Sequence, residues 1–130
     1  MARVLVAEDD PEMRRLVVEA LREDGHEVEE ASDGGRLLIR IAELFDVDPS
    51  LASIDVIVSD VRMPAYNGLE LSERLAEARW RVPFVLMTAF GDDDTRRRAE
   101  HIGATLFDKP LSLADLREAV KRAATRRLAK

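Results

Sequence analysis

The stretch Val4–Val17, VLVAEDDPEMRRLV, predicts a buried strand that runs directly into a helix. Its first part, Val4–Ala7, is a short continuous apolar run, which is typical of a strand covered on both faces. Asp10 can cap the free N–H groups of a helix start, and the proline after it suits the first helical turn. Glu8 and Asp9 stand between the two elements, so this strand ends in carboxylates.

The same alternation of short apolar runs and longer amphipathic runs continues along the chain. Four further strands are expected, at His26–Ala31, Ile54–Ser59, Pro83–Met87 and Ala104–Phe107. A helix is expected after each strand. The apolar stripe predicted for the first helix is Met13, Leu16, Val17, Ala20 and Leu21, and that predicted for the second is Leu38, Ile41, Ala42 and Phe45. Five strands alternating with five helices predict a parallel sheet with helices on both faces.

The composition limits the classes of protein to which the chain can belong. Its 130 residues, 46% hydrophobic and 35% charged, fit one globular domain over residues 1–130. The absence of cysteine excludes a disulfide scaffold, a thiolate metal site and a cysteine nucleophile. A net charge of -6 argues against direct nucleic-acid binding by this domain. No run approaches the ~18 apolar residues of a membrane span, so we expect a cytoplasmic protein without membrane contact.

Chemically active side chains stand where the predicted strands end. Glu8 and Asp9 follow the first strand, and Asp60, Thr88 and Lys109 follow the third, fourth and fifth. Ligands of open α/β sheets bind outside the carboxyl ends of the strands, so these side chains are expected at one rim. Clustered carboxylates repel one another, and a hard cation such as Mg²⁺ would relieve that repulsion. The adjacent lysine and hydroxyl indicate that an anion joins the metal, as phosphoryl transfer requires.

Taken together, four stretches resemble the receiver domain of two-component response regulators and are similar to chemotaxis and NtrC-type receivers. The stretches are VLVAEDDPEMRRLV, VIVSDVRMPAYNGLEL, PFVLMTAF and GATLFDKPLSLADL, which span nearly the whole chain. The resemblance implies a flavodoxin-like (CheY-like) three-layer α/β/α sandwich with a parallel sheet of order 2-1-3-4-5. It also implies a signalling module that accepts a phosphoryl group from a sensor histidine kinase or phosphotransfer protein and catalyses only its own phosphorylation and dephosphorylation.

The resemblance also implies a role for each motif residue. Asp60 resembles the phosphoacceptor, and Thr88 and Lys109 match the residues that contact the phosphoryl oxygens. The Lys109–Pro110 peptide bond is typically cis in receivers. The Mg²⁺ ligands implied by the motifs are Glu8, Asp9, Asp60 and the main-chain carbonyl of Arg62.

Two features depart from the receiver pattern. Receivers carry an aromatic switch residue three places before the lysine, whereas this chain has Leu106 there and Phe107 one place later, on the opposite face of a strand. There are two explanations. Either Leu106 is an aliphatic switch residue that responds to Thr88, or the protein signals through an altered output face. The segment Asp46–Ser53 also looks longer than its counterpart in receivers, which indicates an extra turn and loop or a partner contact.

Other classes of protein compete with this interpretation. A pseudo-receiver would bind partners without phosphorylation, but the complete set of Asp60, Thr88 and Lys109 weighs against it. An aspartate-nucleophile phosphatase usually has a second acid two residues after the nucleophile, where this chain has Arg62. A flavin-binding module would need a hydroxyl- and glycine-rich phosphate loop after the first strand, where the acids of this chain would repel the flavin phosphate.

The expected partners follow from the receiver resemblance. They are a sensor histidine kinase or phosphotransfer protein and a downstream protein or output domain. The face formed by the fourth helix, the fifth strand and the fifth helix could also pair two copies of the chain.

Overall fold

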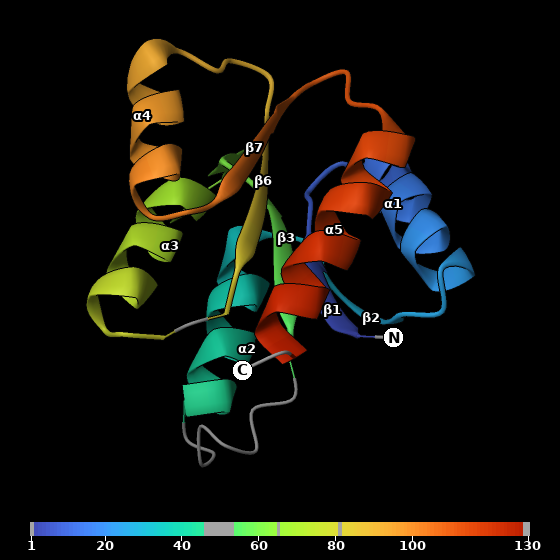
Figure 1. The fold of residues 1–130 in the computed structure, drawn as a ribbon. Coiled ribbons are helices and arrows are strands. Elements are labelled where there is room, and N and C mark those ends of the chain that lie inside the picture. Colours follow the sequence, from blue (N-terminus) through green and yellow to red (C-terminus); the bar gives the residue numbers. More distant parts are fainter. Residues whose placement is uncertain (1, 46–53, 65, 81, 129–130) are drawn as a thin grey trace.

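The computed structural model describes residues 2–45, 54–64, 66–80 and 82–128. These residues form a central parallel sheet between two layers of helices (Figure 1). The strands of the sheet are β1 (Arg3–Ala7), β2 (Glu27–Ala31), β3 (Val56–Asp60), β6 (Phe84–Thr88) and β7 (Thr105–Asp108). Their order is β2-β1-β3-β6-β7, which is the 2-1-3-4-5 order expected for a CheY-like receiver fold.

Two separate apolar clusters attach the helices to the two faces of the sheet. The helices are α1 (Pro11–Glu23), α2 (Gly34–Phe45), α3 (Gly68–Glu77), α4 (Asp93–His101) and α5 (Leu113–Leu128). Side chains alternate along each central strand, so Leu5 of β1 packs with α2, α3 and α4 while its neighbours Val4 and Val6 pack with α1 and α5. The central strands β1, β3 and β6 are thus almost entirely buried on both faces, as their continuous apolar runs predict, whereas the edge strands β2 and β7 are only partly buried.

Polar side chains cap the helices where the sequence indicates a helix start. The carboxylate of Asp10 accepts hydrogen bonds from the N–H groups of Glu12 and Met13 at the start of α1. Ser112 Oγ accepts from the N–H of Asp115 over 3.2 Å at the start of α5. These bonds satisfy N–H groups that have no partner within the helix.

The predicted apolar stripes of the first two helices were wrong at single positions. In α1, Leu16 is 42% exposed and Val18 is buried instead. In α2, Ala42 is exposed and Leu38 only partly buried, because apolar residues surround much of this helix and its spacing admits more than one stripe. The side chain of Phe45 lies outside the described residues. The stripe that α2 buries is Leu37, Ile41 and Leu44.

A short antiparallel pair, β4 (Arg62–Met63) with β5 (Tyr66–Asn67), occupies the segment expected to be only a loop. It returns the chain to Gly68, where a Cβ atom would collide with the carbonyl oxygen of Asp60. Gly68 N–H also donates to the carbonyl oxygen of Val61 over 2.7 Å. The close packing of this turn therefore requires glycine and holds the chain firmly just after the end of β3.

The segment Asp46–Ser53 lies outside the described residues. Among the helices that the structure describes, none combines the length and apolar character needed to cross a bilayer.

His26 is a buried titratable group between α1 and β2. Its Nδ1 accepts a hydrogen bond from the N–H of Ala2 over 3.1 Å. Burial lowers the pKa of His26 because the charged imidazolium would lose its hydration. The neutral ring is also the form that can accept this hydrogen bond, so protonation would break it.

We therefore expect His26 to weaken the fold in mild acid. The unfolded chain takes up the proton near the ordinary histidine pKa of 6.5, before the folded chain does. The free energy of unfolding should then fall as the pH drops below this value, by at most about 1.4 kcal/mol per pH unit. Urea unfolding between pH 7.5 and 5.5 should show a smaller slope for His26→Gln than for the wild type. The exposed His101 provides the control variant His101→Gln, which should keep the wild-type slope; equal slopes for all three proteins would exclude His26 as the source.

Candidate functional site

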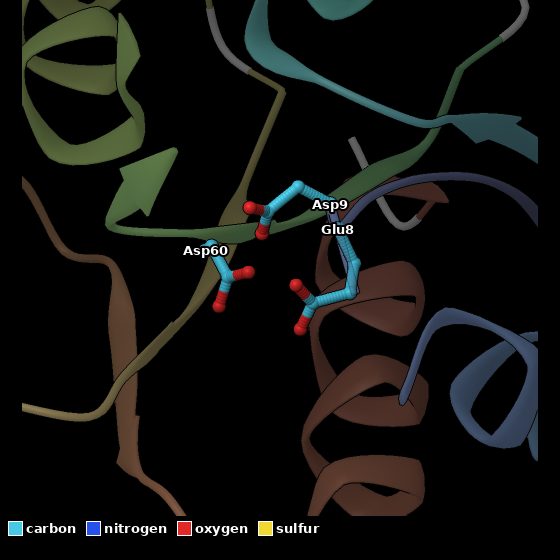
Figure 2. A group of neighbouring side chains, drawn as sticks. All are labelled: Glu8, Asp9 and Asp60. Atoms are coloured by element: carbon cyan, nitrogen blue, oxygen red, sulfur yellow. The ribbon is translucent and has the colours of Figure 1, made fainter. Parts of the chain in front are cut away.

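The carboxyl ends of β1 and β3 bring three carboxylates together at one edge of the sheet. Glu8 and Asp9 directly follow β1, and Asp60 ends β3. The two strands are hydrogen-bonded neighbours with Ala7 opposite Ser59, so the next residues of each emerge side by side. One carboxylate oxygen from each acid lies within 4.8 Å of the other two, and Figure 2 shows the three side chains directed toward one another.

The three acids differ in their exposure to water. Glu8 is fully buried and Asp60 is only 3% exposed, whereas Asp9 is exposed. The site therefore has two carboxylates inside the fold and one at its mouth. Such a set of hard oxygen donors could hold a metal ion.

Lys109 joins the two buried acids. Its Nζ lies 2.8 Å from Glu8 Oε1 and 2.6 Å from Asp60 Oδ1. The main chain holds this lysine in place, because its N–H donates to the carbonyl oxygen of Thr88 over 2.8 Å. The Lys109–Pro110 bond is cis, as the receiver resemblance implies. One ammonium faces three carboxylates, so negative charge remains in excess.

This excess changes the proton affinities of the cluster. Burial, together with the neighbouring Glu8, raises the pKa of Asp60 to about 8, although Lys109 opposes the rise. Burial works against ionisation of Glu8, but hydrogen bonds from Asp60, Lys109 and the Asp10 N–H outweigh it and lower the pKa of Glu8. Burial works against the charged form of Lys109, but its hydrogen bonds to Asp60 and Glu8, together with their negative charge, outweigh burial and raise the pKa of Lys109. Below about pH 8 the cluster thus retains a proton, held by Asp60 beside an ionised Glu8.

Thr88 reaches the same edge from the end of β6. Asp60 lies opposite Met87 in the β3–β6 pairing, so Thr88 is the next residue outward. Its side chain is 3% exposed, and its Oγ1 accepts a hydrogen bond from the N–H of Phe90 over 3.1 Å. Among the described residues there is no acceptor for the Thr88 hydroxyl hydrogen, which can therefore be donated to a ligand.

Arg62 and Phe90 lie together outside this buried group. The guanidinium carbon of Arg62 is 5.8 Å from the centre of the Phe90 ring, within the range of a cation–π contact. Phe90 is 71% exposed although it is a large apolar side chain. The role of the Arg62 main-chain carbonyl as a metal ligand stays a prediction.

Leu106 and Phe107 point to opposite faces of β7. Leu106 packs against the cluster shared with α2, α3 and α4, whereas Phe107 packs against the cluster shared with α1 and α5. The alternation expected for neighbouring strand residues is thus confirmed. Leu106 lies on the face away from α5, and its role as a switch residue stays a prediction.

Arg14 and Arg96 support the site, and sequence reasoning missed both. Arg14 Nη1 donates to the carbonyl oxygen of Glu8 over 2.9 Å, and Arg96 pairs with Asp108, the residue before Lys109, over 2.9 Å. Neither contact leaves a signal in the sequence, since Arg14 resembles any polar residue on an amphipathic helix. The ion pair of Arg96 forms only because α4 packs beside β7.

Comparison with known proteins identifies the family of this chain. Residues 4–121 match the model of the response regulator receiver domain, and the chain therefore belongs to this family of two-component signalling proteins. Its members are phosphorylation-controlled signalling domains and not conventional enzymes. A response regulator implies a histidine kinase as partner.

Named relatives are found among both sequences and solved structures. The chain is 34% identical over 125 residues to the transcriptional regulatory protein PdtaR of Mycobacterium tuberculosis, covering 95% of this chain and 57% of PdtaR. It is 32% identical over 124 residues to the regulatory protein AtoC of Escherichia coli, and this match covers 93% of this chain and 25% of AtoC. The structure of the chemotaxis response regulator CheY4 of Vibrio cholerae superimposes with a TM-score of 0.75 at 28% identity. The superposition covers 95% of this chain and 98% of the CheY4 chain. The chain thus spans about half of PdtaR and about a quarter of AtoC.

Removal of one carboxylate should stabilise the fold when no metal is present. The folded chain holds a proton at Asp60 up to about pH 8, whereas the unfolded chain releases it near 3.8, so stability is lost as the pH rises through this interval. Asp60→Asn removes that cost. In EDTA at pH 8.5 the variant should unfold with a free energy at least about 1 kcal/mol above that of the wild type, which is roughly the energy of one pKa unit.

The pH dependence distinguishes this effect from a general improvement in packing. The advantage of Asp60→Asn in urea unfolding should shrink as the pH is lowered toward 4, because the folded wild type then keeps its proton at Asp60 and the unfolded chain begins to bind one as well. Asp93→Asn, at an exposed aspartate of α4, is the matched control and should show no such trend. An advantage that stays constant from pH 8.5 to 4 would contradict the electrostatic explanation.

Proposed function

We propose that Asp60 is the phosphoacceptor of this receiver domain and takes its phosphoryl group from a phosphohistidine of a sensor kinase or phosphotransfer protein. The proton that Asp60 holds in the metal-free site is released to solvent when the site takes up a cation. One oxygen of the resulting Asp60 carboxylate attacks phosphorus, the phosphorus–nitrogen bond breaks, and its electron pair returns to the imidazole nitrogen. The observation that carries this proposal is the buried Asp60 carboxylate, contacted by Lys109 and facing two further acids from β1.

The donor set fits Mg²⁺. Hard carboxylate oxygens attract this ion, and the excess of acids over ammonium groups leaves negative charge for it to neutralise. Glu8, Asp9, Asp60 and the main-chain carbonyl of Arg62 would hold it. When bound, the ion supplies positive charge that offsets the charge of the phosphoryl oxygens.

Lys109 and Thr88 have complementary roles toward the phosphoryl group. The ammonium of Lys109, already 2.6 Å from Asp60 Oδ1, would donate to one phosphoryl oxygen and keep its contact with Glu8. The hydroxyl of Thr88 would donate to another oxygen. The two donors replace hydration that the transferred group loses on entering the site.

Movement of Thr88 toward the phosphoryl group would transmit the signal. Leu106 is on the neighbouring strand β7, where Thr88 pairs with Asp108 and Leu86 pairs with Leu106. We assign Leu106 as the aliphatic residue that repacks when Thr88 moves. The face formed by α4, β7 and α5 is then the surface that meets a downstream protein, an output domain or a second copy.

A phosphorylation-independent pseudo-receiver is the alternative function. It would use the same fold as a binding module and would need no transfer chemistry at Asp60. The buried Lys109 contact to Asp60 favours the phosphoacceptor, because it provides a positive charge beside the attacking carboxylate.

Phosphorylation should be observed directly as a mass increase. Incubation with acetyl phosphate and Mg²⁺ should add one phosphoryl group to the intact chain, because Asp60, which Lys109 contacts over 2.6 Å, is the one proposed acceptor. Asp60→Asn should add none, and EDTA should abolish the increase in the wild type. Asp93→Asn, a matched change at an exposed aspartate, should behave as the wild type.

Two outcomes would overturn the assignment. Equal phosphoryl uptake by Asp60→Asn and the wild type would move the acceptor to another residue. If neither acetyl phosphate nor a phosphorylated histidine kinase modified the folded chain, and beryllium fluoride with Mg²⁺ did not bind, the pseudo-receiver function would replace it.

Replacement of Leu106 should separate the phosphoryl site from the switch. Leu106 packs against the α2–α3–α4 cluster, so Leu106→Ala should leave the rate of phosphoryl uptake within about twofold of the wild type. It should lower the free energy of unfolding by about 1–2 kcal/mol, less than for a fully buried leucine. Mass spectrometry and urea unfolding measure the two effects. Loss of uptake in a folded Leu106→Ala variant would show that site and switch are not separable.

A further inference from the structure

A groove of about 720 Å³ lies at the end of the sheet opposite the carboxylates. It is lined by the end of α3, the residues that lead into β6, the turn between α4 and β7, and the last turns of α5; Figure 1 shows α3 and α5 ending in this region. Its apolar lining includes Leu75, Trp80, Phe84, Ile102 and Ala104. Small-molecule sites in proteins have volumes of roughly 300–1,000 Å³ and mostly apolar walls.

The described residues that line this groove carry charge of one sign. Among them, Arg79 at the end of α3 and Arg126 near the end of α5 are the charged ones. Both are exposed, and within the part of the chain that the structure describes neither forms a salt bridge. The groove therefore presents two available guanidinium groups beside an apolar surface.

The backbone conformation of Arg79 also distinguishes this groove. Three helices end in the same way, with the second residue after the helix in the left-handed conformation: Gly25 after α1, Gly103 after α4 and Arg79 after α3, with φ values of 87°, 76° and 61°. Glycine adopts this conformation without steric cost, whereas arginine does not. Arginine in this region is uncommon and costs stability that glycine would not.

We propose that the groove binds a small amphipathic carboxylate. Its acyl or aryl body would lie on the apolar floor around Trp80 and Phe84, and its carboxylate would meet the guanidinium groups of Arg79 and Arg126. Arginine suits this partner because its planar fork of N–H groups matches the two oxygens of a carboxylate. The site is separate from the proposed phosphoacceptor, since it lies where β6 and β7 begin and Asp60, Thr88 and Lys109 lie where the strands end.

Octanoate and octan-1-ol are suitable probes, because they differ only in the charged group. Trp80 is the only tryptophan of the chain and lines the groove, so its fluorescence reports occupancy. Octanoate should change this fluorescence saturably and bind about tenfold more tightly than octan-1-ol. Arg79→Gly and Arg126→Gln should each weaken octanoate binding about three- to tenfold and leave octan-1-ol binding unchanged, as expected for the loss of one partly exposed charged contact.

Arg79→Gly carries a second, opposite readout. Because glycine suits the left-handed position, this variant should raise the thermal midpoint by a few degrees while it weakens octanoate binding. A binding loss combined with a stability gain cannot come from damage to the fold. The matched controls are Arg74→Gln on α3 and Arg122→Gln on α5, exposed arginines that do not line the groove and whose loss should leave octanoate binding unchanged.

Three results would overturn the proposal. One is equal binding of octanoate and octan-1-ol, and another is an octanoate affinity that the Arg79 and Arg126 variants do not alter. The third is a dimer detected by sedimentation velocity at micromolar concentration. If octanoate did not compete with this dimer and Arg79→Gly dissociated it, the groove would be assigned to a second copy of the chain. All measurements use the unphosphorylated 130-residue chain, so failure of the phosphoacceptor proposal would not affect them.

Discussion

The contact of the Lys109 ammonium with Glu8 and Asp60 is the interaction on which the carboxylate site depends. It brings a positive charge from the end of β7 to two buried acids from the ends of β1 and β3. Without it, two adjacent carboxylates inside the fold would have no cation among the described residues. Because it neutralises only part of the negative charge, the cluster retains a proton and remains receptive to a further cation.

The same strands connect two chemically different ends of the molecule. Where the strands end, main-chain direction and register bring acids, a lysine and a threonine together. Where β6 and β7 begin, the ends of α3 and α5 leave an apolar groove with two arginines. A rigid parallel sheet suits this division, since both ends are positioned by a sheet whose central strands β3 and β6 are buried throughout.

Most of the fold could be predicted from local patterns, and the errors have physical causes. Continuous apolar runs located β1, β3 and β6, and Asp10 marked the start of α1 correctly. The stripe of α2 was wrong because apolar residues occur around much of this helix, so that only packing against the sheet decides which of them are buried. The pairing of β4 with β5 was missed because two-residue strands carry no periodicity.

The sequence by itself determined which side chains stand at the strand ends, because strand length and the acids after each apolar run are local properties. Tertiary structure alone decided that Asp60 holds the raised pKa rather than Glu8, because that depends on burial and on a lysine from the far end of the chain. It also decided that Arg79 and Arg126 line one groove, because the ends of α3 and α5 come to the same region only after both helices have packed on the sheet.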